Sequence, residues 1–233
     1  MQLKNKSIVI TGGSDGLGFS LAKALVAKGA LVNLIARNKD KLDLAIEQLG
    51  LNAKGFVADV SNWQEIEKVS KEIGSVDVLI NNAGVWIEGS LLNNEISEID
   101  KTIDINLKGT IYATKAFLPK LQKETETHLF NVISTSGMNA RDEQAVYCAS
   151  KFGVSGFTEV LKIDLAKTNL KVTGFYPGGM NTKLFDKAGH PKDNQDWMNT
   201  NKVAEIVVFM LERDSSIAMN QVVLNKRMTR ASN

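Results

Sequence analysis

Cysteine, proline and histidine are scarce in this chain of 233 residues. The single cysteine, Cys148, has no partner for a disulfide within the chain and indicates a reducing, cytoplasmic compartment. The three prolines are not accompanied by any Ser/Gly-rich tract, so we expect one dinucleotide-binding catalytic domain over residues 1–233. The two histidines, His128 and His190, lack the spacing of metal ligands, and no metal site is expected.

Long apolar runs and a surplus of one charge are also missing. No apolar run approaches the ~18 residues of a membrane span, and the first residues lack the apolar region of a signal peptide. The 28 Lys and Arg residues are interspersed with 26 Asp and Glu residues, which leaves a formal net charge of +2. Neither a membrane nor a nucleic acid is therefore expected as a partner.

Short β-branched runs alternate with amphipathic segments along the whole chain. Strands are predicted near residues 7–11, 31–36, 53–58, 76–81, 129–134, 170–176 and 221–225. Helices are predicted near residues 16–28, 39–49, 63–73, 96–121, 145–168 and 202–212. This alternation predicts an α/β fold of the single-domain Rossmann type, a doubly wound parallel sheet of about seven strands with helices on both faces. Ligands bind such sheets at the carboxyl ends of the strands.

The helices predicted at 96–121 and 145–168 are apolar on more than one side. A helix on the surface of a domain needs only one apolar stripe. The excess indicates either deep burial or a subunit interface, and the pattern alone leaves both open.

Three glycines, Gly12, Gly16 and Gly18, lie where the first strand meets the first helix. Glycine permits positive φ and lets the backbone approach a pyrophosphate, while the amide groups and the dipole of the helix attract the anion. Their spacing is not the G-x-G-x-x-G of the common dinucleotide fingerprint. By itself the segment is equally consistent with a phosphate site and with a plain tight turn.

Tyr147 and Lys151 are four residues apart at the start of a predicted helix, which places both side chains on one face. An unperturbed phenol has a pKa of about 10. An ammonium at about 4 Å would lower that pKa to near 7, where a proton donor works best. Because this spacing is also common on solvated helix faces, the surrounding motifs decide between the two interpretations.

Two further polar residues occupy informative positions. Ser134 ends a predicted strand, where its hydroxyl can donate to a substrate oxygen beside Tyr147 or bind the backbone of its own turn. Asn106 interrupts an apolar helix, where it is either exposed or needs a hydrogen-bond partner.

Taken together, the motifs resemble those of the short-chain dehydrogenases/reductases of the single-domain type, in order and spacing, over roughly residues 5–182. The matching segments are Thr11-Gly12-x-x-x-Gly16-x-Gly18, Asn81-Asn82-Ala83-Gly84, Asn106, Ser134, Tyr147-x-x-x-Lys151 and Pro177-Gly178-Gly179-Met180-Asn181-Thr182. The resemblance implies that Tyr147 is the general acid/base and that Lys151 lowers its pKa and holds the nicotinamide ribose. It also implies that Ser134 orients the substrate carbonyl and that Asn106 anchors a water in a proton relay.

The same resemblance implies the contacts of a nicotinamide dinucleotide. Besides Tyr147 and Lys151, they fall at the glycine turn and at the ends of later strands. The implied residues are Gly12, Ser14, Asp15, Gly16, Leu17 and Gly18 for the pyrophosphate and adenosine ribose, Asp59 and Val60 for the adenine, Asn82, Ala83 and Gly84 beside the central strands, and Pro177, Gly178, Met180 and Thr182 near the nicotinamide.

The end of the second strand indicates which dinucleotide is used. Enzymes that use NAD place a carboxylate there for the ribose 2′-OH. This chain has Ala36 instead, followed by Arg37, whose guanidinium can pair with a 2′-phosphate. We therefore expect NADP (NADPH) as the cofactor. The alternative for Arg37 is a solvated side chain at the start of a loop.

The expected function is that of an NADP(H)-dependent oxidoreductase that reduces a small-molecule ketone or aldehyde to an alcohol, or catalyses the reverse reaction. A catalytically silent cofactor-sensing or scaffold protein is the alternative, which is disfavoured because Tyr147 and Lys151 are both present. A lyase or epimerase is disfavoured by the glycine spacing and by the lack of a second substrate domain.

Three further expectations concern assembly and access. The family pairs its two apolar helices across subunits, so a homo-oligomer, tetramer or dimer, is expected. Residues 183–200 are expected to form a substrate lid. The basic segment 226–230 is expected to be solvated.

Overall fold

A computed structural model describes residues 1–227 of the chain. Within these residues seven strands form one parallel sheet in the order β3-β2-β1-β4-β5-β6-β7. The strands are β1 (Ser7–Thr11), β2 (Leu31–Ala36), β3 (Ala53–Val57), β4 (Val78–Asn81), β5 (Thr127–Val132), β6 (Leu170–Pro177) and β7 (Gln221–Leu224). The predicted doubly wound parallel sheet is confirmed.

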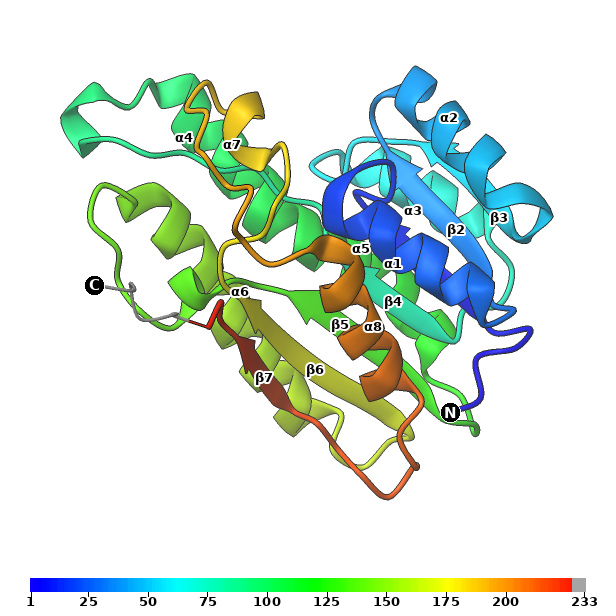
Figure 1. The fold of residues 1–233 in the computed structure, drawn as a ribbon. Helices are drawn as coiled ribbons and strands as arrows, with labels where there is room; N and C mark the ends of the chain where they lie inside the picture. The colour runs from blue at the N-terminus through cyan, green and yellow to red at the C-terminus, as the bar shows by residue number, and fades with distance from the viewer. Residues whose placement is uncertain (228–233) are drawn as a thin grey trace.

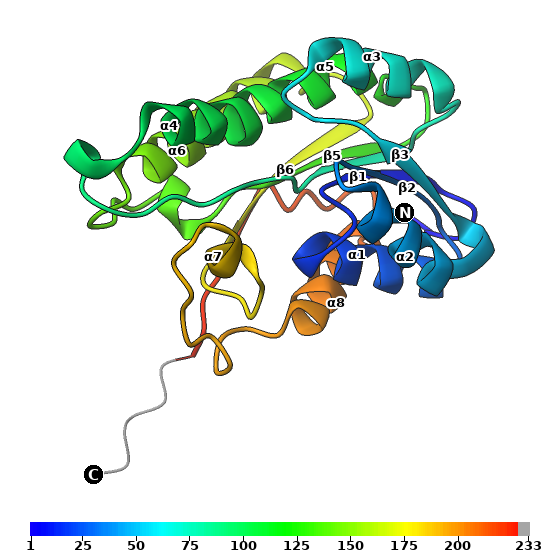
Figure 2. The ribbon, with the colours of Figure 1, turned by 90° about the horizontal axis from the view of Figure 1, so that it is seen from above.

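Helices cover both faces of this sheet (Figure 1 and Figure 2). One face carries α1 (Gly16–Ala27), α2 (Lys39–Leu49) and α8 (Thr200–Leu211). The other carries α3 (Trp63–Glu72), α4 (Ile96–Ile103), α5 (Gly109–Leu121) and α6 (Ala145–Asp164). Short helical turns lie at η1 (Gly50–Asn52), η2 (Leu91–Asn93), η4 (Thr135–Gly137) and α7 (Leu184–Lys187). No helix of the described part of the chain is both long and apolar enough to cross a membrane.

The continuous apolar runs of the strands follow from this two-sided cover. On β1, Ile8 and Ile10 join the apolar core beneath α1 and α8, whereas Val9 joins the core beneath α3 and α5. Successive side chains of a strand point to opposite faces, so a strand buried on both faces is apolar along most of its length. All three side chains are fully buried.

The helix predicted at 96–121 is interrupted, and the prediction of one regular helix is wrong. Between α4 and α5 lies a π-helical turn, η3 (Asp104–Lys108), with Asn106 at its centre. The wider turn directs the Asn106 amide onto the backbone of Val85, where it both accepts and donates a hydrogen bond. Such π-turns cost regular helical hydrogen bonds and recur at functional sites.

Burial explains only part of the apolar excess of the two long helices. Phe117 of α5 and Val154 of α6 are buried within the chain. On α6, by contrast, Phe152 is 45% exposed, Val160 54% and Ile163 75%. Deep burial therefore accounts for much of α5, while one side of α6 is left uncovered by the part of the chain that the structure describes.

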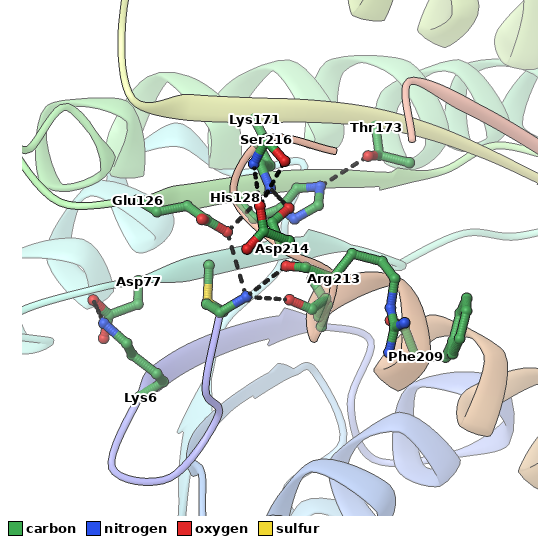
Figure 3. A network of polar contacts seen from close by, with 12 residues as sticks. Lys6, Asp77, Glu126, His128, Lys171, Thr173, Phe209, Arg213, Asp214 and Ser216 are labelled. Carbon is green, nitrogen blue, oxygen red and sulfur yellow. Dashed lines mark hydrogen bonds and ion pairs between the residues drawn. The ribbon is translucent and has the colours of Figure 1, made fainter. Parts of the chain in front are cut away.

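The amino ends of the strands carry a polar network remote from the carboxyl ends (Figure 3). The Met1 ammonium donates to the backbone oxygens of Leu211 and Arg213 and lies 3.5 Å from the Glu126 carboxylate. Lys171 lies 3.3 Å from the same carboxylate and also donates to the backbone oxygen of Asp214. This network joins the starts of β5 and β6 to the end of α8.

His128 of β5 is buried beside this network. Its Nε2 lies 2.8 Å from Thr173 Oγ1, and that hydroxyl donates its hydrogen to the Met219 carbonyl. Nε2 is therefore assigned as the protonated nitrogen of a neutral ring. Burial, reinforced by the positive charges of Lys171 and the Met1 ammonium, lowers the pKa of His128 to about 3.

We expect His128 to make the fold sensitive to acid. The unfolded chain takes up a proton near pH 6.5, whereas folded His128 does not until about pH 3, so stability falls as the pH drops through this window. At pH 5 the loss relative to pH 7.5 is about 2 kcal/mol, equivalent to about 4–8 °C in Tm. In thermal denaturation, the Tm of a His128→Gln variant is expected to fall less between pH 7.5 and pH 5, because the contribution of His128 is missing. A His190→Gln variant, altered at an exposed histidine, is expected to retain it; equal responses in all three proteins would contradict the assignment.

Candidate active site

The carboxyl ends of the central strands open into a cavity of about 1170 Å³. Most of the residues predicted from the sequence to form the site line this single cavity. They are Gly12, Ser14, Asp15, Gly16, Leu17, Arg37, Val60, Asn82, Ala83, Gly84, Ser134, Tyr147, Lys151, Pro177, Gly178, Met180 and Thr182. Gly18, Asp59 and Asn106 do not line the cavity, but each contacts a residue that does. Gly18 packs against Gly12, Asp59 pairs with Arg37, and Asn106 forms hydrogen bonds with Val85.

The glycine turn has the backbone geometry of an open cradle. Gly12 and Gly16 adopt φ values of +66° and +53°, in the left-handed region that favours glycine. A Cβ atom at Gly12 would lie 2.9 Å from Ala83 Cα, and one at Gly18 would lie 2.2 Å from the Gly12 carbonyl oxygen. Gly18 therefore lets α1 pack closely against the turn.

Asp15 begins α1 and faces the cavity. Its carboxylate accepts a hydrogen bond from the backbone N–H of Gly16 at 2.7 Å. Although burial alone would raise it, the pKa of Asp15 is lowered by hydrogen bonds and by the nearby ammonium groups of Lys187 and Lys41. The amino end of α1 thus faces the cavity, where a helix attracts an anion.

The turn after β4 is fastened to the glycine turn. Thr11 Oγ1 accepts hydrogen bonds from the backbone N–H groups of Asn82 and Ala83, at 3.0 and 3.1 Å. The Asn82 amide donates to the carbonyl oxygens of Thr11 and Gly12. These bonds hold two neighbouring strand ends in a fixed relation at the floor of the cavity.

Arg37 lies at the end of β2, directly after buried Ala36, and its side chain is 50% exposed. Its guanidinium lies 3.3 Å from the Asp59 carboxylate. Despite the opposing effect of burial, hydrogen bonds from Ser61 and the charge of Arg37 lower the pKa of Asp59. Asp59 therefore positions Arg37 at the rim, and contact of Asp59 with an adenine stays a prediction.

Ser134, Tyr147 and Lys151 meet at the inner end of the cavity. Tyr147 and Lys151 lie one turn apart on α6 and are 7% and 5% exposed. The Lys151 ammonium lies 5.8 Å from the centre of the Tyr147 ring. Within the described residues its hydrogen-bond partner is the carbonyl oxygen of Val132, at 3.4 Å. A buried ammonium with one long hydrogen bond retains donors for a ligand.

The expected phenol pKa near 7 is wrong for this structure. Burial raises the pKa of Tyr147 to about 12, although a hydrogen bond with Ser134 acts in the opposite direction. Burial also lowers the pKa of Lys151 to about 8. The spacing of the two residues predicts only the effect of the nearby charge, whereas both groups are buried and the loss of hydration dominates their pKa values.

Asn106 supports the reacting groups from behind. Its side chain is fully buried, and its Nδ2 donates to the Val85 carbonyl and to Ser150 Oγ, at 2.9 and 3.0 Å. Ser150 Oγ in turn donates to the backbone oxygen of Tyr147. Asn106 thus ties η3 to the turn of α6 that carries the tyrosine, and its role in a water relay stays a prediction.

Residues 183–200 lie over the cavity. An isolated bridge between Met180 and Met198 closes the base of this segment. The Phe185 ring packs edge-on against Trp86 and Trp197, with ring centres 4.6 and 5.1 Å apart. Lys187 pairs with Asp15 of the glycine turn at 2.9 Å.

Several charged residues line the cavity without having been assigned a role from the sequence, although three of them lie in the predicted lid segment; they are Lys41, Arg141, Lys183, Lys187, Lys192, Lys226 and Arg227. Lys226 and Arg227 are exposed, as expected for this basic segment, and they also line the cavity, because the end of β7 runs along Gly178, whose N–H binds the Leu224 carbonyl. Residues 228–230 lie outside the described residues. The sequence signal that could have identified these residues is the presence of several basic residues in the segments next to the motifs.

These residues fit a nicotinamide dinucleotide. The glycine cradle and the amino end of α1 can hold its phosphates, Arg37 can meet the adenosine ribose, and the Lys151 ammonium has donors for the other ribose. Among the described residues, no cluster of His, Cys, Asp and Glu side chains could hold a metal ion. The fold and the site define a dinucleotide-binding oxidoreductase.

Comparisons with known proteins define the family. The family model described as short chain dehydrogenase matches residues 6–193. An uncharacterized oxidoreductase of Staphylococcus aureus (strain N315) is 33% identical over 227 residues, with 95% of this chain and 97% of that protein covered. The closed form of serine dehydrogenase complexed with NADP+ has a TM-score of 0.89 at 25% identity, covering 97% of this chain and 98% of that one. The chain belongs to the short-chain dehydrogenase family.

Proposed function

We propose that this protein reduces a ketone or aldehyde with NADPH, or oxidises the corresponding alcohol with NADP+. The observation that carries the proposal is the meeting of Ser134, Tyr147 and Lys151 at the inner end of a cavity whose other end is the glycine cradle. A cavity lined by both sets of residues can hold a dinucleotide and a carbonyl compound together.

Ser134, Tyr147 and Lys151 have different roles in this reaction. The bound nicotinamide supplies or accepts the hydride. Ser134 and Tyr147 hold the carbonyl oxygen by hydrogen bonds, and Tyr147 transfers its proton to that oxygen as negative charge develops. With a pKa of about 12, the buried phenol keeps its proton throughout the neutral range. Lys151 holds positive charge beside the phenol and donates to the ribose.

A carbonyl panel tests the proposal. NADPH consumption is followed at the nicotinamide absorbance with ketones, aldehydes and oxo acids, and NADP+ reduction with the matching alcohols. We expect turnover with at least one pair. A protein that binds NADPH and turns over neither set would instead be the silent sensor or scaffold.

We expect NADPH to be preferred over NADH by about 10- to 100-fold in kcat/KM, because a charge-assisted pair is worth about 1.5–3 kcal/mol. Arg37 would supply this pair, and Ala36 offers the competing ribose hydroxyl no acceptor. The Arg37→Ala variant should lose most of the preference by weakening NADPH. The NADP+ bound to the similar serine dehydrogenase supports the same choice.

Lys39→Ala is the matched control for Arg37, because Lys39 is exposed at the start of α2, two residues further along the chain, and does not line the described cavity. It should leave the cofactor preference unchanged. The double variant Ala36→Asp, Arg37→Ile should favour NADH, since a carboxylate accepts from the 2′-OH and repels the 2′-phosphate. Equal kcat/KM for both cofactors in the unmodified protein would mean that Arg37 faces solvent.

We also propose a homo-oligomer, a tetramer or a dimer, formed through α5 and α6. The exposed apolar side chains of α6 support this interface, and a shallow cavity between the two helices includes Phe157. Light scattering at micromolar protein should give a multiple of 25.5 kDa, and Phe157→Asp should lower it. Leu92→Asp, at a side chain that is 95% exposed and lies on η2 rather than on α5 or α6, should not. A monomeric mass for the unmodified protein would refute the proposal.

Two other parts of the proposal concern the chain's surroundings and access. Residues 183–200 act as a lid, which their position over the cavity and the Lys187–Asp15 ion pair support. A reducing, cytoplasmic setting is also proposed, which the single cysteine, Cys148, free and buried, supports.

A further inference from the structure

The charges that line the cavity have almost one sign. Among the described residues, the acidic side chain of the lining is Asp15. The basic ones are Arg37, Lys41, Arg141, Lys151, Lys183, Lys187, Lys192, Lys226 and Arg227. Since the whole chain carries a formal net charge of only +2, this basic lining is concentrated in the cavity rather than spread over the chain. A concave site with such a lining attracts anions.

The phosphates of a dinucleotide account for one part of this charge. Arg37 and Lys41 lie beside the end of β2, and Lys41 and Lys187 both face the Asp15 carboxylate at the glycine turn. These groups belong to the end of the cavity that the proposed function gives to the cofactor.

Other basic groups lie at the reacting end. Lys192 stacks over the Trp86 ring at 4.8 Å, and Trp86 shares an apolar cluster with Tyr147. Its charge is balanced, because its ammonium lies 2.8 Å from the Glu88 carboxylate. Lys192 is therefore less available to a ligand.

Arg141 differs from Lys192 in this respect. It lies on the loop between η4 and α6, and its guanidinium donates to Thr135 Oγ1 at 3.4 Å. Thr135 directly follows Ser134, which holds the substrate oxygen in the proposed reaction. Within residues 1–227 the Arg141 guanidinium forms no ion pair and the residue is exposed, so the donors other than the one bound to Thr135 are open to a ligand.

We propose that Arg141 binds a carboxylate of the substrate and that the substrate is a short oxo acid or the matching hydroxy acid. This inference rests on the proposed function. Arginine binds carboxylates through two parallel hydrogen bonds. Because Thr135 directly follows Ser134 and both residues line the cavity with Arg141, a short oxo acid can present its carboxylate to Arg141 and its carbonyl to Ser134.

The test compares an acid with its neutral ester. With NADPH as the reductant, kcat/KM is measured for acetoacetate and for methyl acetoacetate. The unmodified protein should prefer the acid by about 10- to 100-fold, and Arg141→Gln should bring the ratio of acid to ester close to one. Arg141→Lys, which keeps the charge but loses the fork, should retain part of the preference. Arg213→Gln, at the far end of the sheet (Figure 3), should retain all of it.

The outcomes separate this inference from the proposed function. An ester reduced as well as the acid by the unmodified protein would overturn the role of Arg141 and leave carbonyl reduction intact. If no carbonyl is reduced, the proposed function fails, and malonate binding then decides the inference. Trp86 and Trp197 line the cavity, so their fluorescence reports a titration with malonate. Saturable binding that weakens about 10-fold or more in Arg141→Gln supports the carboxylate site, whereas no binding, or equal binding, rejects it.

Discussion

Replacing Tyr147 by phenylalanine is expected to abolish carbonyl reduction while NADPH binding is retained. The substitution removes only the hydroxyl, and the ring stays in its buried position beside Trp86. Loss of a general acid costs about 10²- to 10⁴-fold in rate. We therefore expect kcat to fall by about that range, with the Kd of NADPH changed by no more than about tenfold, because one neutral hydrogen bond contributes about 0.5–1.5 kcal/mol.

Tyr112→Phe is the matched control. Tyr112 lies on α5, packs edge-on against Trp63 and is absent from the described cavity lining. Its loss of a hydroxyl should leave kcat unchanged. If Tyr147→Phe kept more than about one tenth of the unmodified rate, another group would have to supply the proton, because general acid catalysis accounts for at least about 10²-fold.

The features that the sequence predicts well are local. Glycines at a strand-to-helix turn identify the cradle, because only glycine adopts the backbone of Gly12 and Gly16 without strain. Alternating apolar strands and helices define the doubly wound sheet, and the carboxyl ends of its strands then gather motifs that are distant in sequence. Tyr147 and Lys151 needed only the helical period to be placed together.

The features that the sequence did not predict depend on burial and on long-range pairs. The pKa of Tyr147 follows from loss of hydration, which a one-dimensional spacing does not contain. The π-turn at Asn106 arises because its amide binds Val85, 21 residues earlier in the chain. The cavity lining by Arg141 depends on how the loop before α6 folds back on Thr135.

Lys151→Met is the substitution with the widest expected consequences. The Lys151 ammonium is expected to assist Tyr147 by its positive charge and to donate hydrogen bonds to the ribose. Because the substitution removes both interactions, kcat and NADPH affinity should both fall. Two charge-assisted hydrogen bonds to a ligand correspond to about 3–6 kcal/mol, or at least about 100-fold in Kd. Lys162→Met, at a lysine of the same helix that pairs with Glu159 and does not line the described cavity, should leave both quantities unchanged. An unchanged NADPH affinity in Lys151→Met would mean that Lys151 does not bind the ribose.

Lys151→Met should lower the activity of the protein without lowering the stability of its fold. Burial lowers the pKa of Lys151 from 10.5 to about 8 in the folded chain, so the unfolded chain binds the extra proton between these values. Stability of the unmodified protein therefore gains a contribution as the pH rises from 8 to 10, and at neutral pH the buried ammonium destabilises the fold by about 3 kcal/mol. Methionine has a similar length and no charge to bury. Denaturant unfolding at pH 7 should show Lys151→Met to be at least as stable as the unmodified protein, and its stability should lack the rise between pH 8 and 10. A less stable variant would mean that Lys151 is held for packing. A Lys151→Met variant that is inactive but more stable would mean that Lys151 is needed for the reaction although its buried charge destabilises the fold.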